Sequence, residues 1–344
     1  MSAAIQKLQH VRRAERRRPL LVVVALLLSL VAIFAVRVLL GSYTVAIPDF
    51  FAILNGQSIP GASGARFIVL TDKLPRAVLG TLVGLSFGAA GAIFQLLFRN
   101  PLASPDIIGI STGASLGAVI GIVFFGVGGL ALSGFAAAAA LLVAALIMVL
   151  ASGGGNTGGR FILMGIGVAA LGAALINYLL TRMALPNAQS AALWLTGSLG
   201  PANWERIRLV AVALAVLALA VTAICRRLHL LAVGDELAHG LGLPVRATYW
   251  GGLILAVLLT AVATAAAGPI AFVPLISGPL ARGLLGGRHS ILASALVGAC
   301  IVVAADFVAA NYLPGGNLPV GVLTGMVGAP VLIWLLTRSR NEGR

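Results

Sequence analysis

Charged side chains are scarce in this chain of 344 residues. Asp, Glu, Lys and Arg together make up 9% of the sequence, apolar residues make up 60%, and the mean hydropathy is +1.07. A soluble domain carries charges at about a quarter of its positions. The shortage excludes an ordinary soluble fold and predicts an all-α integral membrane protein.

Residues that bind metals or form disulfides are also few. Cys225 and Cys300 lie in or beside apolar runs, and the four histidines are scattered, so the sequence shows neither a disulfide framework nor a metal-ligand spacing. We therefore expect no metal site and no cofactor on this chain.

The sequence lacks a nucleotide-binding loop as well. Such a loop requires Gly-Lys followed by Ser or Thr, whereas the only lysines, Lys7 and Lys73, follow Gln6 and Asp72. The chain is therefore predicted not to be an enzyme, to have no catalytic residue and not to hydrolyse ATP itself.

Ten apolar runs predict about ten transmembrane helices. They cover residues 19–40, 76–98, 107–125, 130–150, 161–181, 207–225, 248–267, 270–285, 291–311 and 319–337. The first run is longer than the core of a signal peptide, which has about 7–15 residues, and is interpreted as a retained helix. Residues 1–18 then form a basic arm, 19–337 a single transmembrane domain and 338–344 a tail.

The positions of Lys and Arg predict the orientation of these helices. If both termini are cytosolic, sixteen of the 23 basic residues fall in cytosolic segments and seven in outer segments, as the positive-inside rule requires. The arginines lie at the ends of apolar runs rather than on one basic face. The net charge of +14 therefore does not indicate a nucleic-acid partner.

A short charged stretch at 234–244 interrupts the apolar sequence. It carries Asp235, Glu236 and His239 between Gly234 and a Gly242-Leu243-Pro244 stop, which predicts a short helix. The charge distribution places it in the cytosol. An ordinary solvated loop is the alternative.

Glycines recur every four residues in the second apolar run, at Gly80, Gly84 and Gly88. This spacing forms a flat stripe on one helix face, against which another helix can approach closely. The stripe is compatible with simple bundle packing and with a central helix that its neighbours surround.

Asp306 is the one acid deep within an apolar run. Acids inside membrane spans are candidates for function, including proton relay. No second carboxylate or histidine lies close to Asp306 in the sequence, so a structural hydrogen-bonding role is expected.

Several motifs together resemble the permease family of type II ABC importers, which take up ferric siderophores, haem and cobalamin. They are Leu74-Pro75-Arg76, Gly91-Ala92-Ile93-Phe94-Gln95, 99–105, 109–115, Trp194-x2-Gly197-Ser198-Leu199, 234–244, Gly268-Pro269-Ile270-Ala271-Phe272-Val273, Ala305-Asp306, and Leu318-Pro319-Val320-Gly321 through Gly328-Ala329-Pro330. The resemblance runs from about 74 to 336, and 99–113 is most similar to the ferric-catecholate siderophore branch.

The resemblance assigns a role to the charged stretch. In this family, the cytosolic segment between helices six and seven couples the permease to its ATPase subunits. The residues expected to do so here are Gly234, Asp235, Glu236, Ala238, His239 and Gly242.

Three further groups of residues follow from the resemblance. Docking of an extracytoplasmic substrate-binding protein is expected at Lys73, Arg76 and Arg66; a cytosolic gate is expected at Asn156, Thr157, Gly158 and Gly159; and a pore lining is expected at Gly165, Gly167, Gly172 and Asn177. The chain departs from the family pattern at Ala310, where a basic docking residue is common. It also departs at Ser277-Gly278-Pro279, where many relatives have a Pro-His pair.

The family implies a set of partners and a location. They are a second permease copy or a paralogous permease, two ATPase subunits that bind ATP and Mg, a substrate-binding protein and the lipid bilayer of the bacterial inner membrane. The expected cargo is an iron–siderophore complex, with cobalamin or haem as the alternative. An ion-coupled secondary transporter would show several buried ionisable residues or inverted repeats, and a structural or sensor membrane protein would leave the cytosolic stretch unexplained.

Overall fold

The computed structural model describes residues 2–57, 64–152, 157–312 and 318–342, and the regular secondary structure in these ranges is entirely helical. The helices are α1 (Ser2–Leu39), α2 (Ile47–Leu54), α3 (Ala65–Phe67), the π-helical η1 (Ile68–Lys73), α4 (Leu74–Phe98), α5 (Ile110–Phe125), α6 (Gly129–Ala151), α7 (Thr157–Arg182), α8 (Leu185–Leu195), α9 (Trp204–Leu231), α10 (Asp235–Gly240), α11 (Val245–Ala267), α12 (Val273–Leu284), α13 (Ile291–Asn311) and α14 (Val320–Glu342).

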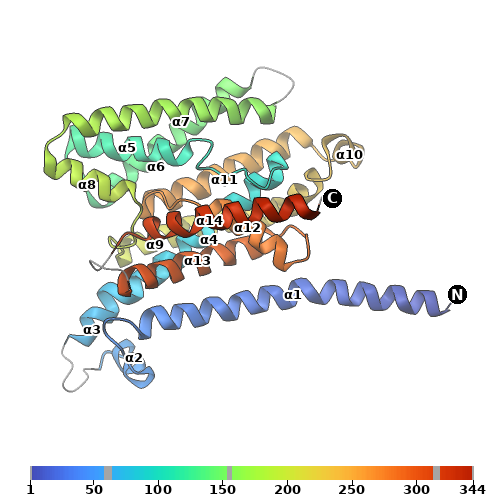
Figure 1. Ribbon diagram of the computed structural model, residues 1–344, viewed down its shortest axis with the longest axis horizontal. Helices are drawn as coiled ribbons and strands as arrows, with labels where there is room; N and C mark the ends of the chain where they lie inside the picture. The colour runs from blue at the N-terminus through green and yellow to red at the C-terminus, as the bar shows by residue number, and fades with distance from the viewer. Residues whose placement is uncertain (1, 58–63, 153–156, 313–317, 343–344) are drawn as a thin grey trace.

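Most of the long helices run along one axis of the bundle (Figure 1). The first residues of α1, the last residues of α14 and the short helix α10 lie at one end, which we call the α10 end. Helices α2, α3 and α8 lie at the opposite end, which we call the α2 end. α1 follows one edge of the bundle and α7 follows the other. The two chain termini and α10 share one end.

α4 is the central helix of the bundle. It packs against α13, α11, α12 and α9, and 78% of the most apolar window in its span is buried, against 6% for α1. The glycine stripe makes this packing close: a Cβ atom on Gly84 would lie 2.5 Å from Ala299 Cα of α13, and one on Gly88 would meet the Ser294 carbonyl oxygen. The stripe therefore lies at a backbone-to-backbone contact between α4 and α13.

Seven helices in the described ranges are long and apolar enough to cross a membrane. They are Arg18–Leu39, Ala65–Phe98, Gly129–Ala151, Gly159–Arg182, Trp204–Leu231, Val245–Ala267 and Ile291–Asn311. The other three expected runs coincide with shorter helices, which are Ile110–Phe125, Val273–Leu284 and the apolar part of α14, Val320–Trp334. The all-helical architecture is confirmed, and the count of ten spans stays a prediction.

The bounds of two helices differ from the sequence prediction. The second run begins at Ala65 rather than at 76, because α3, η1 and α4 form one continuous helical path in which the π-turn η1 precedes Pro75. The eighth run is shorter than predicted, since Phe272 has a left-handed backbone (φ 66°) and the helix begins only after it, with Pro274 in its first turn.

The helix α8 was not among the predicted elements. It follows α7 closely and has Pro186 at its start, a position that proline tolerates because the missing N–H has no helical partner there. It packs against α5 and α7. The region between the fifth and sixth predicted spans is therefore ordered at the α2 end rather than a simple connection.

Candidate functional site

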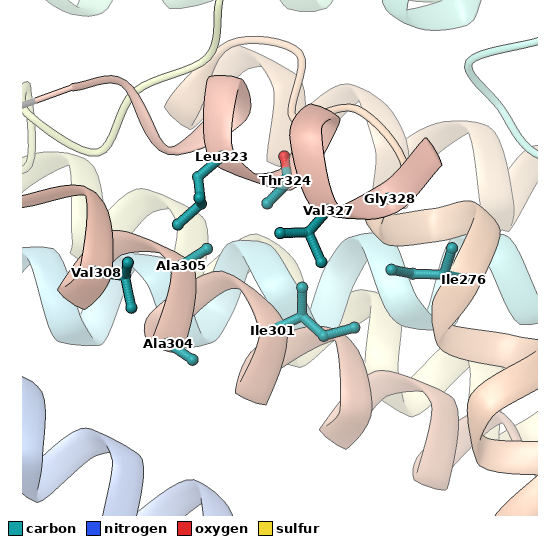
Figure 2. Close-up of a pocket in the computed structure, with 9 residues that line it drawn as sticks. All are labelled: Ile276, Ile301, Ala304, Ala305, Val308, Leu323, Thr324, Val327 and Gly328. Carbon is teal, nitrogen blue, oxygen red and sulfur yellow. The ribbon is translucent and has the colours of Figure 1, made fainter. Parts of the chain in front are cut away.

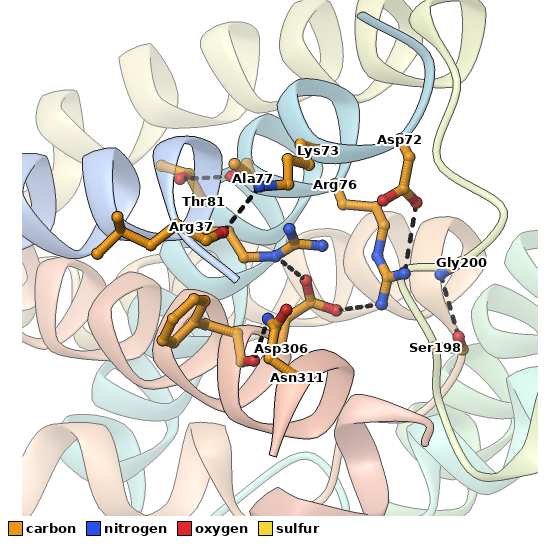
Figure 3. A network of polar contacts seen from close by, with 12 residues as sticks. Arg37, Asp72, Lys73, Arg76, Ala77, Thr81, Ser198, Gly200, Asp306 and Asn311 are labelled. Atoms are coloured by element: carbon orange, nitrogen blue, oxygen red, sulfur yellow. Dashed lines mark hydrogen bonds and ion pairs between the residues drawn. The ribbon is translucent and has the colours of Figure 1, made fainter. Parts of the chain in front are cut away.

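A buried cluster of charges joins three helices at the α2 end (Figure 3). Asp306 of α13 accepts a hydrogen bond from Arg37 Nε of α1 at 2.6 Å on Oδ2 and from Arg76 Nη2 of α4 at 2.8 Å on Oδ1. The three side chains are 2%, 7% and 2% exposed for Arg37, Arg76 and Asp306. Asp306 thus has the hydrogen-bonding environment expected of a structural residue, and its carboxylate is shared by two guanidinium groups.

The end of α1 is fastened beside this cluster. Lys73 Nζ donates to the Leu40 carbonyl oxygen at 2.8 Å and also to that of Tyr43. The Ser42 amide donates to Asn311 Oδ1 of α13 at 2.8 Å. These bonds satisfy backbone groups just after α1, where the helix leaves carbonyl groups without helical partners.

This geometry bears on the three residues expected to dock a binding protein. Lys73 and Arg76 are buried and turned toward groups of this chain, whereas Arg66 in α3 is exposed. Arg76 also approaches the half-exposed Asp72 at 3.5 Å. The structure brings Lys73 and Arg76 together with Asp306 and Arg37, and only Arg66 of the three is exposed; the docking assignment stays a prediction.

Arg37 is the member of this cluster that the sequence did not single out. It lies one turn before the end of the first apolar run and is separated from Asp306 by 269 residues. An arginine inside an otherwise apolar run is the signal that could have suggested a buried acidic partner.

The expected coupling segment forms a short exposed helix at the α10 end. Asp235, Glu236 and His239 are exposed, while Ala238 is fully buried and anchors the helix between α9 and α11. The acids stand in the first turn and the histidine in the last, which suits the helix dipole. The predicted short helix is therefore present, and its charged face points away from the bundle.

Glycines with positive φ bound this helix on both sides. Gly234 has φ 129° and Gly242 has φ 79°, and a Cβ atom on either would meet nothing within 4 Å. These backbone conformations favour glycine even though the space around them is open. Leu237 and Leu241 are 62% and 70% exposed beside the acids, so the helix presents an apolar and acidic surface.

The connection between α4 and α5 lies near this helix. Arg99, just after α4, donates to the Leu231 carbonyl oxygen at 3.0 Å and forms an ion pair with Asp235. Further along, Asp106 accepts a hydrogen bond from Ser111 Oγ at 2.5 Å. Burial raises the pKa of the Asp106 carboxyl to about 6.

The residues expected at a cytosolic gate lie at the start of α7. Asn156 falls outside the described residues, and Thr157, Gly158 and Gly159 form the first turn of the helix. This turn is at the same end of the bundle as α10 (Figure 1). The gate assignment stays a prediction.

The four residues expected to line a pore occupy two different faces of α7. Gly165 and Gly172 are buried: a Cβ atom on Gly165 would lie 2.7 Å from the carbonyl oxygen of Ile108, just before α5, and one on Gly172 would lie 3.0 Å from Thr112 Cγ2 of α5. Gly167 and Asn177 are exposed. The geometry gives Gly165 and Gly172 a packing role, so only the other two face outward from the bundle.

A cavity of about 310 Å³ lies between α12, α13 and α14 (Figure 2). Its lining is apolar apart from Thr324, whose hydroxyl donates to the Gly321 carbonyl oxygen at 3.1 Å. A metal chelate carries polar and charged groups, which such a lining cannot hydrogen-bond. The cavity is therefore a poor candidate for a chelate-binding site.

Comparison with known proteins identifies the family of this chain. The sequence profile of the FecCD transport family matches residues 26–338. The chain belongs to this family.

Relatives within the FecCD transport family are transport permeases. The ferric enterobactin transport system permease protein FepG of Escherichia coli is 36% identical over 306 residues, which cover 88% of this chain and 91% of that protein. The Fe(3+) dicitrate transport system permease protein FecD of Escherichia coli is 40% identical over 280 residues, 80% of this chain and 86% of that protein. Other similar proteins are named as hemin and cobalamin permeases.

A solved structure supports the same assignment for this FecCD member. An inward-facing metal-chelate type ABC transporter is 28% identical with a TM-score of 0.81, and the match covers 92% of this chain and 98% of that chain. Together with the apolar helices, the family identifies a multi-pass membrane protein with the ABC importer permease fold. The sequence-based recognition of this family is confirmed.

Proposed function

We propose that this chain is the permease subunit of an ATP-driven importer in the bacterial cytoplasmic membrane, and that it moves an iron–siderophore complex into the cytoplasm by alternating access. We also propose that the chain has ten spans and that both termini lie in the cytosol. The position of α10 and both termini at one end of the bundle supports this topology. The α2 end then faces outward.

The observation that carries the proposal is the exposed helix α10 between two positive-φ glycines. An importer permease without a nucleotide site needs a surface that receives movement from a separate ATPase. α10 offers acidic and apolar side chains on a short rigid element that is anchored by Ala238. Two ATPase subunits, with ATP and Mg bound to them, would press on this surface in a pair of permeases, identical or paralogous.

The cargo is proposed as an iron–siderophore complex because the two relatives described above are named for ferric enterobactin and Fe(3+) dicitrate. Cobalamin or haem is the second candidate, because similar proteins bear those names. An extracytoplasmic binding protein would deliver the cargo at the α2 end, with Arg66 as the exposed basic group for docking.

The charge cluster at the α2 end disfavours an ion-coupled secondary transporter. A proton-coupled acid must be free to gain and lose its proton during the cycle. The Asp306 carboxylate is instead held in a buried site, where Arg37 binds one of its oxygens and Arg76 binds the other.

The test is uptake in proteoliposomes that contain this permease with or without its ATPase subunits. Glu236→Ala removes an exposed acid of α10, and Gly242→Ala forces a side chain into a left-handed backbone, so both variants should hydrolyse ATP with little uptake. Glu205→Ala, an exposed acid at the α2 end, is the matched control and should behave as the wild type. Normal uptake by the α10 variants would reject the coupling assignment, and uptake without the ATPase would reject the importer class.

A further inference from the structure

Arg99 connects the end of the central helix to the start of α10. Its Nη2 donates to the carbonyl oxygen of Leu231, the last residue of α9, at 3.0 Å, and pairs with Asp235, the first residue of α10. One guanidinium group therefore bridges α4, α9 and α10. Arg99 and Leu231 lie 132 positions apart in the chain.

The backbone of Arg99 is unusual for an arginine. Its φ is 48° and its ψ is 35°, a left-handed conformation that ends α4. Glycine or asparagine usually occupies such a position after a helix. Among the described residues, only Arg99 and Phe272 adopt positive φ without being glycine. The conformation turns the chain out of α4 while the long side chain reaches back to α10.

Apart from the contacts of Arg99 and the anchor at Ala238, α10 makes few contacts with the bundle. Its main helix contacts are with α9 and α11. Ala238 is its one buried residue, and the flanking Gly234 and Gly242 have open space around them. A force on the exposed face could therefore bend these flanking residues rather than move the bundle, unless α10 is fastened to a rigid element.

α4 is such a rigid element, and it carries ionic contacts at both ends. Close packing on α13 and α11 surrounds its middle. Arg76, near its start, pairs with Asp306 and thereby joins Arg37 of α1 at the α2 end. A shift passed to α4 through Arg99 would reach the opposite end as a rigid-body displacement.

We propose that Arg99 is a positioning residue that ties α10 to α4, so that movement imposed on α10 displaces the central helix. The proposal rests on the function proposed above, because the ATPase is the source of that movement. The ion pair is 41% and 66% exposed on its two sides, so it adds little to folding stability. We expect the loss of this ion pair to change the transmission of movement from α10 to α4 rather than the stability of the fold.

The first test needs no partner protein. Hydrogen exchange of residues 234–243 is measured in the full chain in lipid nanodiscs, for the wild type and for Arg99→Asn. Asparagine tolerates the left-handed backbone, so the variant removes the guanidinium without displacing the turn. Exchange is expected to rise by about two- to fivefold, as loss of an exposed ion pair would give. Arg227→Asn, which removes an exposed arginine of α9, should leave it unchanged. Unchanged exchange in Arg99→Asn would overturn the proposal.

The second test measures uptake per ATP hydrolysed in proteoliposomes with the ATPase subunits. Arg99→Asn should lower this ratio by about fivefold or more, within the range of couplings between distant sites, while Arg227→Asn should not. The charge swap of Arg99→Asp with Asp235→Arg should recover part of the lost coupling, which a general loss of folding could not do. A normal ratio in Arg99→Asn, or no recovery in the swap, would overturn the positioning role.

The two tests separate the proposals. Wild-type uptake that does not depend on the ATPase would defeat the importer function, and the exchange experiment would still decide whether Arg99 fastens α10. ATP-dependent uptake with unchanged exchange in Arg99→Asn would keep the importer function and defeat the role of Arg99.

Discussion

A single carboxylate, Asp306, pairs with two arginines from different helices in a buried site. Removing one partner from a buried ion pair costs more than the pair contributes, because the remaining charge stays buried without compensation. Asp306 is therefore the residue on which the contact between α1, α4 and α13 at the α2 end depends.

Replacing Asp306 with Asn should destabilise the chain by about 3–5 kcal/mol, since both Arg37 and Arg76 would lose their shared counter-charge. Thermal unfolding in detergent checks this change. Asp72→Asn is the matched control: it removes the exposed acid at 3.5 Å from Arg76 and should cost about 0–1 kcal/mol. Equal losses in the two variants would show that the buried carboxylate has no special role.

The residues of this cluster show what a sequence can indicate about a site. Asp306 was identifiable because an acid in an apolar run is costly. Its partners were not, because contacts across 230 and 269 residues leave no trace in local spacing. The same limit applies at the α10 end, where the charged stretch was predicted as a short helix but its ion pair with Arg99 was not.

At the scale of elements, the contact between α4 and α13 depends on the glycines Gly84 and Gly88 of α4. Ser294, Gly298 and Ala299 of α13 face Gly84 and Gly88 of α4 at backbone distance. Without a strong hydrophobic force between helices in lipid, close packing of this kind is what holds them together.

Gly88→Ala should therefore lower stability and separate α4 from α13, because the new methyl group would overlap the Ser294 carbonyl. Gly251→Ala in α11 meets nothing within 4 Å and should be neutral or slightly stabilising, since alanine favours helix. Unfolding midpoints of the two variants in detergent make the comparison. A Gly88→Ala protein as stable as Gly251→Ala would mean that the helices can move apart at little cost.

Apolar runs predicted most of the elements well, because lipid requires long apolar helices. The predicted bounds of helices were wrong where a proline or a turn sets the start of the helix. α12 begins late because Phe272 and Pro274 set its start, and η1 extends the second span before Pro75. α8 was missed because it has 11 residues, too few to give a transmembrane signal.

At the scale of the whole molecule, the proposed topology requires the two ends of the bundle to face different compartments. The positive-inside rule suggested this arrangement, and the bundle places α10 with both termini. The orientation of the bundle in the membrane was predicted from the positions of Lys and Arg, because the packing of the helices does not indicate which end is cytosolic.

In a chain lacking Cys225 and Cys300, single cysteines introduced at the two ends should differ in their reaction with a membrane-impermeant maleimide. On intact cells, a cysteine at Arg66, which is exposed at the α2 end, should be labelled. Cysteines at Arg246, which is exposed near α10, and at Ser2 should be labelled only after the cells are opened. Labelling of Ser2→Cys from outside would refute the cytosolic N-terminus.

The fastening of α1 also has a consequence for how the protein is made. Arg37 of α1 is synthesised 269 residues before Asp306, the acid with which it pairs. Until α13 is made, Arg37 therefore lacks this counter-ion at the end of an apolar helix. Assembly of the α2 end must wait for the last helices. A nascent chain that stops before α13 would therefore keep Arg37 without the acid that binds it in the folded protein.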